Sequence, residues 1–303
     1  MRTATSRAAA APLLLLWACT AGSTDPTDSA GPTDSTDVSD DTDLPECPTW
    51  GEPRQVGQVS ADGLTEISGL APSRSRDHYW VHNDSGDGPV LYGLQPDGTL
   101  VQTVEVDVAA ARDWEAMATA GDGSLWIGDI GDNKSVRDKV TLHRITKEPA
   151  SGESRASGPS YDLTYEGGPR DAEALLVDVD GKVYIIDKQD DGQSTLFWAD
   201  TDGGVLRAQG PLTLDGGASL VRTVTAGTIS DDGSIIVIRT YFSALAFRRT
   251  PNLSIAEALA GTPCELGLPL QPQGETLAFL PNSTDLVTIS EGNDPVVWQI
   301  DRE

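Results

Sequence analysis

The sequence predicts an all-β fold, a β-propeller of five blades, with six blades as the alternative. The main observation is a short motif that recurs along the chain. One copy is Asp113-Trp114-Glu115-Ala116-Met117-Ala118, in which acidic residues precede small and apolar ones. The other copies begin at Glu66, Asp171, Thr225 and Gln273. One position of the motif forms a column of Ser68, Glu115, Glu173, Gly227 and Glu275. Its members lie about 50 residues apart, the spacing of four-stranded blades.

Strand-like runs follow each copy, so that each repeat reads as one blade. The expected strands are 67–71, 78–82, 90–94 and 100–106; 116–119, 124–128, 140–145 and 160–165; 174–179, 182–186, 195–199 and 205–212; 228–229, 234–238 and 244–248; and 276–280, 285–289 and 296–300. Asp-Gly pairs at 122–123, 180–181 and 232–233 predict hairpin turns, and 255–259 predicts one helical turn. A sixth blade is possible only within the long segment 119–170.

An alternating run at 54–60 precedes the first copy and has no blade of its own. We expect it to pair with 296–300, the last strand of the chain. This N-terminal strand would close the ring and leave no open sheet edge.

The N-terminal region predicts export. Residues 1–18 combine early basic residues with an apolar run too short to span a bilayer, which is typical of a signal peptide. Ala18-Cys19 resembles a bacterial lipobox, which implies cleavage before Cys19 and lipidation of its thiol. Trp17 departs from the small residue usual there, so plain secretion is the alternative. Residues 19–46 repeat Thr-Asp pairs without Lys or Arg, so we expect a disordered tether, and residues 47–303 form the propeller domain.

Charge and cysteine content narrow the possible partners. The formal net charge is −26, which argues against nucleic acid and against anionic lipid surfaces, so a membrane is expected only through the lipid anchor. Beyond Cys19, the cysteines are Cys47 and Cys264. A pair in an exported chain predicts one disulfide, which would join the start of the domain to a late loop.

The column predicts a metal site. The first strand of each blade lines the central channel, so the three glutamates of the column would converge there, and like charges at close range raise one another's pKa. A cation resolves this conflict. Carboxylate, hydroxyl and carbonyl oxygens are the ligands that calcium takes, and no His or Cys suggests zinc. Alternatives are another divalent ion, or a purely structural network in which the acidic residues bind backbone N–H groups and Arg112 or Arg170.

The column resembles the central calcium site of five-bladed, calcium-dependent apyrase-type propellers, where the five blades supply Ser, Glu, Glu, Ser and Glu. Ser68, Glu115, Glu173 and Glu275 match four positions, and Gly227 stands where that family has its second Ser, which a backbone carbonyl could replace. The sequence more closely resembles exported bacterial propellers of unassigned activity, through 113–115, 128–133, 171–175 and 290–292. Nucleotidase activity is not implied, because the nucleotide-holding residues of apyrases are not found here.

Strand direction predicts a ligand-binding face. First strands begin and second strands end on one side of the ring, which would gather Asn83, Asp84, Asp113, Asp129, Asp171, Lys188, Arg239 and Glu291. We expect a binding module of the bacterial cell envelope, as an outer-membrane lipoprotein or otherwise secreted, that recognises a protein or glycan. One alternative is a calcium-dependent phosphohydrolase or esterase acting on a small phosphoester or ester, in which Asp84 or Glu291 activates water. A second is a structural envelope lipoprotein.

Overall fold

The computed structural model describes residues 44–84, 86–214 and 221–303. The described residues form one compact unit. The predicted signal peptide, Cys19 and nearly all of the predicted tether lie outside the described residues. Within the described residues the unit is built of strands, with one short helix, α1 (Ile255–Leu259). The all-β class expected from the sequence is confirmed.

The strands form four hydrogen-bonded sheets. The first contains β2 (Ile67–Pro72), β3 (Tyr79–Asn83), β4 (Val90–Leu94), β5 (Leu100–Val106) and β9 (Arg155–Ala156). The eight-stranded sheet contains β6 (Trp114–Thr119), β7 (Leu125–Asp129), β8 (Val140–Ile145), β10 (Ser160–Tyr165), β11 (Ala172–Val177), β12 (Val183–Asp187), β13 (Gln193–Asp200) and β14 (Val205–Thr213). The third contains β15 (Val224–Ile229), β16 (Ile235–Thr240), β17 (Ala244–Arg248) and β18 (Cys264–Leu266). The last contains β19 (Ala278–Phe279), β20 (Leu286–Ile289), β21 (Val296–Ile300) and β1 (Arg54–Gln58).

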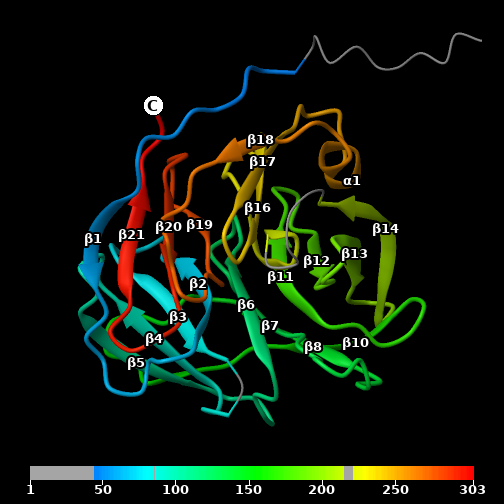
Figure 1. Cartoon of the computed structure of the whole chain (residues 1–303). Coiled ribbons are helices and arrows are strands. Elements are labelled where there is room, and N and C mark those ends of the chain that lie inside the picture. Colours follow the sequence, from blue (N-terminus) through cyan, green and yellow to red (C-terminus); the bar gives the residue numbers. More distant parts are fainter. Residues whose placement is uncertain (1–43, 85, 215–220) are drawn as a thin grey trace, which may run out of the picture. The chain divides into compact units, whose positions relative to one another are not determined.

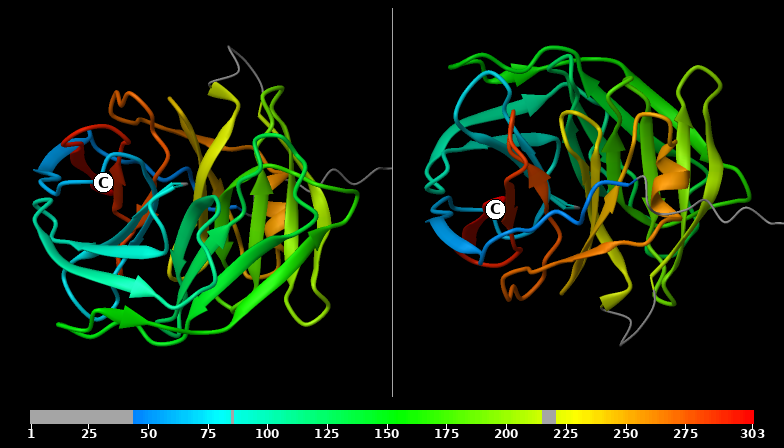
Figure 2. Two further views of the ribbon diagram at one scale, coloured as in Figure 1. Left: turned by 90° about the horizontal axis from the view of Figure 1, so that it is seen from below. Right: turned by 90° about the horizontal axis from the view of Figure 1, so that it is seen from above.

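The first strand of each repeat lies on the inside of the unit. In Figure 1, β2, β6, β11 and β19 lie near the centre, while β5, β10 and β14 lie at the periphery. The inner strands contact one another in a closed cycle, in the order β2, β6, β11, β15, β19 and back to β2. Sheets that radiate from such a cycle define a β-propeller. The single helix packs outside this ring against β14 and β17, and Figure 2 shows it in orange beside the yellow-green β14.

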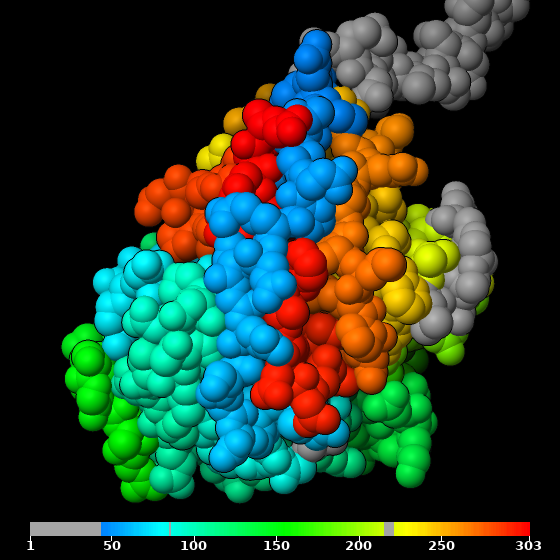
Figure 3. Space-filling view, turned by 60° about the vertical axis from the view of Figure 1, so that its left-hand side comes forward, coloured from blue at the N-terminus to red at the C-terminus, as the bar shows by residue number. Residues whose placement is uncertain are grey.

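The two ends of the described chain meet in one sheet. β1 pairs antiparallel with β21, with Gln58 opposite Val296, and Figure 3 shows the blue N-terminal segment running beside the red C-terminal strand. Cys47 and Cys264 form a disulfide with a Cα–Cα distance of 5.8 Å. The bond ties the segment before β1 to the edge strand β18 of the neighbouring sheet. Both contacts hold the ring closed through residues far apart in the sequence.

The apolar core lies between neighbouring sheets. Successive side chains of a strand point to opposite faces, so one inner strand can serve two cores. In β11, Leu175 belongs to a buried cluster with Leu142 of β8, while Leu176 belongs to another with Ile238 of β16. β11 is therefore held by apolar contacts on both of its faces.

The structure differs from the expected strands in several places, including β18, which was not expected, and β19, which is shorter than the expected 276–280. β6, β11 and β15 begin two to four residues earlier than expected, because a break in the alternation hides their first residues, as described below. The segment 146–159 contains β9, which pairs in parallel with β5 of the preceding repeat. β9 therefore adds an edge strand to the neighbouring sheet and does not form a separate sheet.

Candidate functional site

The column residues occupy one repeated irregularity of the inner strands. In β6 the pairing with β7 passes from Trp114 opposite Asp129 to Ala116 opposite Gly128, so Glu115 has no partner across the ladder. β2 skips Ser68 and β11 skips Glu173 in the same way. Such β-bulges turn one side chain away from the usual alternation and are frequent next to functional sites. Here they allow polar side chains to turn out of the apolar sheet packing.

In the fourth repeat the bulged residue is Thr225, not Gly227. β15 pairs Val224 with Thr240 and Ala226 with Arg239, which leaves Thr225 unpaired. A Cβ atom at Gly227 would meet Leu176 Cδ2 at 2.8 Å, so a side chain there would enter the core between the sheets. The alignment that placed Gly227 in the column was therefore shifted by two residues. With Thr225 in its place, the column reads Ser68, Glu115, Glu173, Thr225 and Glu275.

The structure nevertheless brings all five predicted residues to one place. Ser68, Glu115, Glu173, Gly227 and Glu275 line a common cavity inside the cycle of inner strands. Its volume is about 10 Å³, enough for about one water-sized sphere. The remaining lining is largely apolar and includes Leu70, Met117, Leu175 and Leu277. The predicted convergence on the axis is thus present in the geometry.

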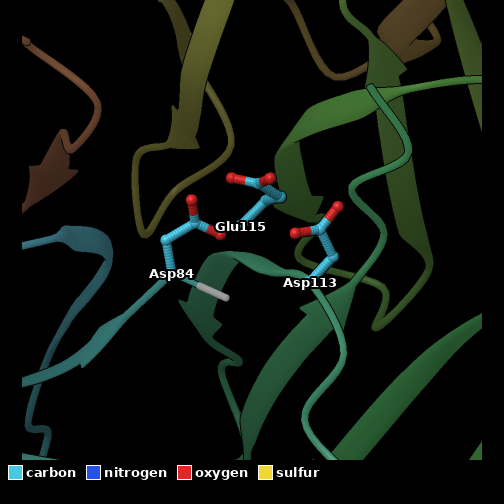
Figure 4. A group of neighbouring side chains, drawn as sticks. All are labelled: Asp84, Asp113 and Glu115. Atoms are coloured by element: carbon cyan, nitrogen blue, oxygen red, sulfur yellow. The ribbon is translucent and has the colours of Figure 1, made fainter. Parts of the chain in front are cut away.

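A tighter group of carboxylates lies beside Glu115. Asp84 follows β3, Asp113 precedes β6 and Glu115 lies in β6, and one oxygen of each carboxylate lies within 4.8 Å of the others. Figure 4 shows the three side chains around a common space. Gly131 leaves this space open, because a Cβ atom there would collide with Glu115 Oε1 and with the carboxylate of Asp113. The backbone at Gly131 therefore forms one wall of the carboxylate group.

Burial and mutual repulsion raise the pKa values of several carboxyls in and near this group. Glu115 is 3% exposed, and its pKa is raised well above the usual range by burial first and then by Glu173, Asp84 and Asp113. Burial raises the pKa of Glu173 to about 8, although its ion pair with Lys188 Nζ opposes the shift. Burial, with a hydrogen bond to Glu275, raises the pKa of Glu291 to about 9. Without a cation, the surroundings therefore disfavour the negatively charged forms of these carboxyls.

The donor set fits a hard divalent cation. Glu173 is 4% exposed, and its Oε2 has no hydrogen-bond partner among the described residues, while Oε1 binds Lys188. A buried carboxylate oxygen without a partner is costly in free energy unless something else occupies that position. The available ligands are carboxylate and hydroxyl oxygens, as calcium prefers, and the cluster contains no His or Cys.

The predicted ligand-binding face divides into two sets. One set is partly exposed and consists of Asp84, Asp113, Asp171, Lys188 and Glu291, of which Asp84 and Asp113 belong to the carboxylate group. Asn83, Asp129 and Arg239 are 5%, 3% and 0% exposed and are used by the fold. Asp129 pairs with Arg137 at 2.6 Å, and Asn83 binds the carbonyl of Gly63 at 2.6 Å. These three side chains are not presented to a ligand.

Arg239 is the largest departure from the expected face. Its guanidinium donates hydrogen bonds to Gly274 O at 2.9 Å, Thr288 Oγ1 at 2.6 Å and Gln271 Oε1 at 2.7 Å. Burial lowers the pKa of Arg239 to about 9. A Cβ atom at Gly274 would collide with the guanidinium, so the buried position of Arg239 depends on the absence of a side chain there.

Comparison with known proteins identifies no family for this chain. No protein-family model matches the sequence, and a comparison with curated proteins gives no match. Solved structures that resemble it include a luciferin-regenerating enzyme, with a TM-score of 0.46 and 14% identity over 80% of this chain and 79% of that one. A PQQ-bound aldose sugar dehydrogenase from Streptomyces coelicolor has a TM-score of 0.49 and 12% identity over 86% and 100%. A gluconolactonase from Xanthomonas campestris has a TM-score of 0.49 and 12% identity over 86% and 98%. No activity is transferred from these proteins.

Among the described residues, no helix has the length and apolar character needed to cross a membrane.

Proposed function

We propose that the ring consists of five blades and that its channel holds one calcium-type divalent cation. The eight-stranded sheet supports the blade count, because it separates into two antiparallel sets, β6-β7-β8-β10 and β11-β12-β13-β14. Only the parallel pairing of β10 with β14 joins the two sets. Each set then has the four strands of one blade.

One observation carries the cation: the convergence of Asp84, Asp113 and Glu115 to within 4.8 Å. Three ionised carboxylates at this distance repel one another strongly in a partly buried setting. A divalent cation removes the repulsion and also supplies a partner near Glu173, whose Oε2 has none among the described residues. The proposed ligands are Asp84, Asp113 and Glu115, with Ser68, Glu173 and Glu275 around the adjoining cavity.

The role that fits this site best is a binding module with a cation at its acidic face. The partly exposed carboxylates leave one side of the group accessible, so a ligand oxygen could complete the coordination of the ion. A lipid-anchored position in the bacterial envelope, or secretion, and a protein or glycan ligand remain part of this proposal. They are supported by the N-terminal sequence and by the formal net charge of −26.

Equilibrium dialysis against labelled calcium tests the proposal on the purified full chain. We expect about one ion per chain with wild type and at least tenfold weaker binding with Asp113→Asn. Asp138→Asn, at an exposed position outside the group, is the matched control and should bind as wild type. No binding by wild type would leave the carboxylates as a purely structural network.

A calcium-dependent phosphohydrolase or esterase is the second candidate. It is favoured by the position of Asp84, predicted as a water-activating base, within the same carboxylate group as Glu115. A bound divalent cation would supply a Lewis acid for a phosphoryl or carbonyl oxygen. Calcium-dependent turnover of nitrophenyl phosphates or esters that Asp84→Asn abolishes would establish this activity, and no turnover with calcium bound would exclude these reactions.

A further inference from the structure

A second site lies on the same side of the ring. It is an open pocket of about 890 Å³, within the size range of small-molecule sites. Its walls come from loops that follow β7, β12 and β16 and from the segment before β19. Lys188 and Asp171 belong to this pocket, and Lys188 also pairs with Glu173 of the column. The pocket is therefore connected to the cavity lined by the column residues through this ion pair.

The pocket offers neutral hydrogen-bonding groups together with an aromatic surface. Asn133, Gln189 and Gln273 contribute side-chain amides. Phe242 is 45% exposed, and Tyr241 lies next to it in the chain. An exposed aromatic ring beside amides is suited to a ligand with an apolar face and a polar edge.

The carboxylates of the pocket are held in place by the fold. Asp171 Oδ1 accepts the backbone N–H of Asp132 at 2.7 Å, and Asp191 Oδ1 accepts that of Gln193 at 2.9 Å. Asp190 Oδ1 accepts the hydroxyl of Thr223 at 3.2 Å. The Oδ2 atoms take no part in these bonds. Fixed carboxylate oxygens are good acceptors for ligand hydroxyl groups.

The charges of the pocket argue against an anionic ligand, and the position of Lys188 argues against a cation over Tyr241. Asp171, Asp190 and Asp191 repel an anion such as a phosphoester, and the ammonium of Lys188 is already paired with Glu173. An organic amine would be attracted to the same carboxylates. Its ammonium group would preferably lie over the aromatic ring of Tyr241. Lys188 Nζ already lies 5.7 Å from the centre of that ring, so a second cation there would be repelled.

We propose that this pocket binds a neutral carbohydrate, with one sugar ring against Phe242 and its hydroxyl groups on the amides and on Asp190 and Asp191. The inference rests on the proposed function, because it names the ligand class of the binding module. It adds a site that is distinct from the cation ligands.

Calorimetric titration of the full chain with maltotriose, cellotriose and chitotriose, in calcium and again in chelator, tests the proposal. Spermidine and glucose 6-phosphate represent the amine and anionic classes. We expect saturable binding of at least one trisaccharide, weakened about tenfold by Phe242→Ala and by Asp191→Asn. Val179→Ala removes another exposed apolar side chain, 57% exposed and outside the pocket, and should change the affinity less than about twofold.

The outcomes separate this inference from the proposed function. If the wild-type protein binds a trisaccharide but does not bind calcium, the pocket proposal is supported and the cation proposal is contradicted. Calcium binding without binding of any of the three trisaccharides overturns the pocket proposal alone, as does stronger binding of spermidine or glucose 6-phosphate. Thermal melts of the variants show whether a loss of binding reflects a loss of folding.

Discussion

Ser68 on β2 donates a hydrogen bond from its hydroxyl to the backbone carbonyl of Glu115 on β6, at 2.8 Å. Thr225 makes a similar bond to the carbonyl of Gly274, the residue before Glu275, also at 2.8 Å. In both cases, the hydroxyl group of the bulged residue donates a hydrogen bond to the backbone of the next repeat in the chain. The hydroxyl groups of Ser68 and Thr225 thus connect neighbouring repeats, whereas Glu115 and Glu173 bring carboxyl groups to the cavity that they line.

Thr225→Val should lower the free energy of unfolding by about 1 kcal/mol, because it removes a buried hydrogen bond with little change in shape. Thr225→Ser keeps the hydroxyl and should lose less. Urea unfolding followed by tryptophan fluorescence measures both. A Val variant as stable as wild type would show that this bond does not contribute to joining the repeats.

Gly131→Ala should weaken calcium binding at least tenfold, since the added methyl group displaces the carboxylates of Glu115 and Asp113. Gly121→Ala is the control, because a Cβ atom at Gly121 has no neighbour within 4 Å. Calorimetric titration with calcium compares the two. Equal affinities would place the ion away from Gly131.

Gly274→Ala should destabilise the protein by about 3 kcal/mol, because the methyl group displaces the buried guanidinium of Arg239 from its hydrogen bonds. Gly267→Ala, where a Cβ atom has no neighbour within 4 Å, should have a small effect. Thermal and urea unfolding test this pair. If the two variants are equally stable, the Arg239 network is not important for the fold.

The metal-free protein should lose stability as the pH rises from about 5 to 9. Burial raises the pKa of Glu173 to about 8 and that of Glu291 to about 9. A carboxyl whose pKa is raised by folding stabilises the folded state fully below its unfolded pKa, and this contribution is lost as the pH passes the folded pKa.

Thermal melts in chelator across this pH range measure the effect. Calcium should restore the lost stability, and most strongly at the alkaline end, because cation binding competes with protons for the same oxygens. A melting temperature that does not change with pH in chelator would contradict the charge repulsion on which the cation proposal depends.

Much of the ring was predictable because its signals are local. The strands 90–94, 100–106, 140–145, 160–165, 244–248 and 296–300 have the expected bounds. Gly123 and Gly181 have φ of 81° and 82°, as the Asp-Gly hairpin turns require. Strand alternation also indicated that 54–60 would pair with the last strand, and β1 does pair with β21.

The missed features depend on contacts that alternation does not reveal. Thr223-Val224-Thr225-Ala226 carries the same pattern as Glu66-Ile67-Ser68-Gly69, and this was the available signal for Thr225. The burial of Arg239 depends on Gly274, 35 residues later in the chain. The role of Gly131 depends on the carboxylates of Asp113 and Glu115 that lie beside it, which strand alternation does not indicate.

The most direct test of the central claim is the melting temperature at pH 8 of the full chain, with calcium and with chelator, for wild type and Glu115→Gln. Calcium should raise the melting temperature of wild type. The variant, which cannot supply a carboxylate ligand at this position, should respond little to calcium. Glu52→Gln, at an exposed position, should behave as wild type. A calcium response that is unchanged in Glu115→Gln, or absent from wild type, would contradict a cation site in the channel.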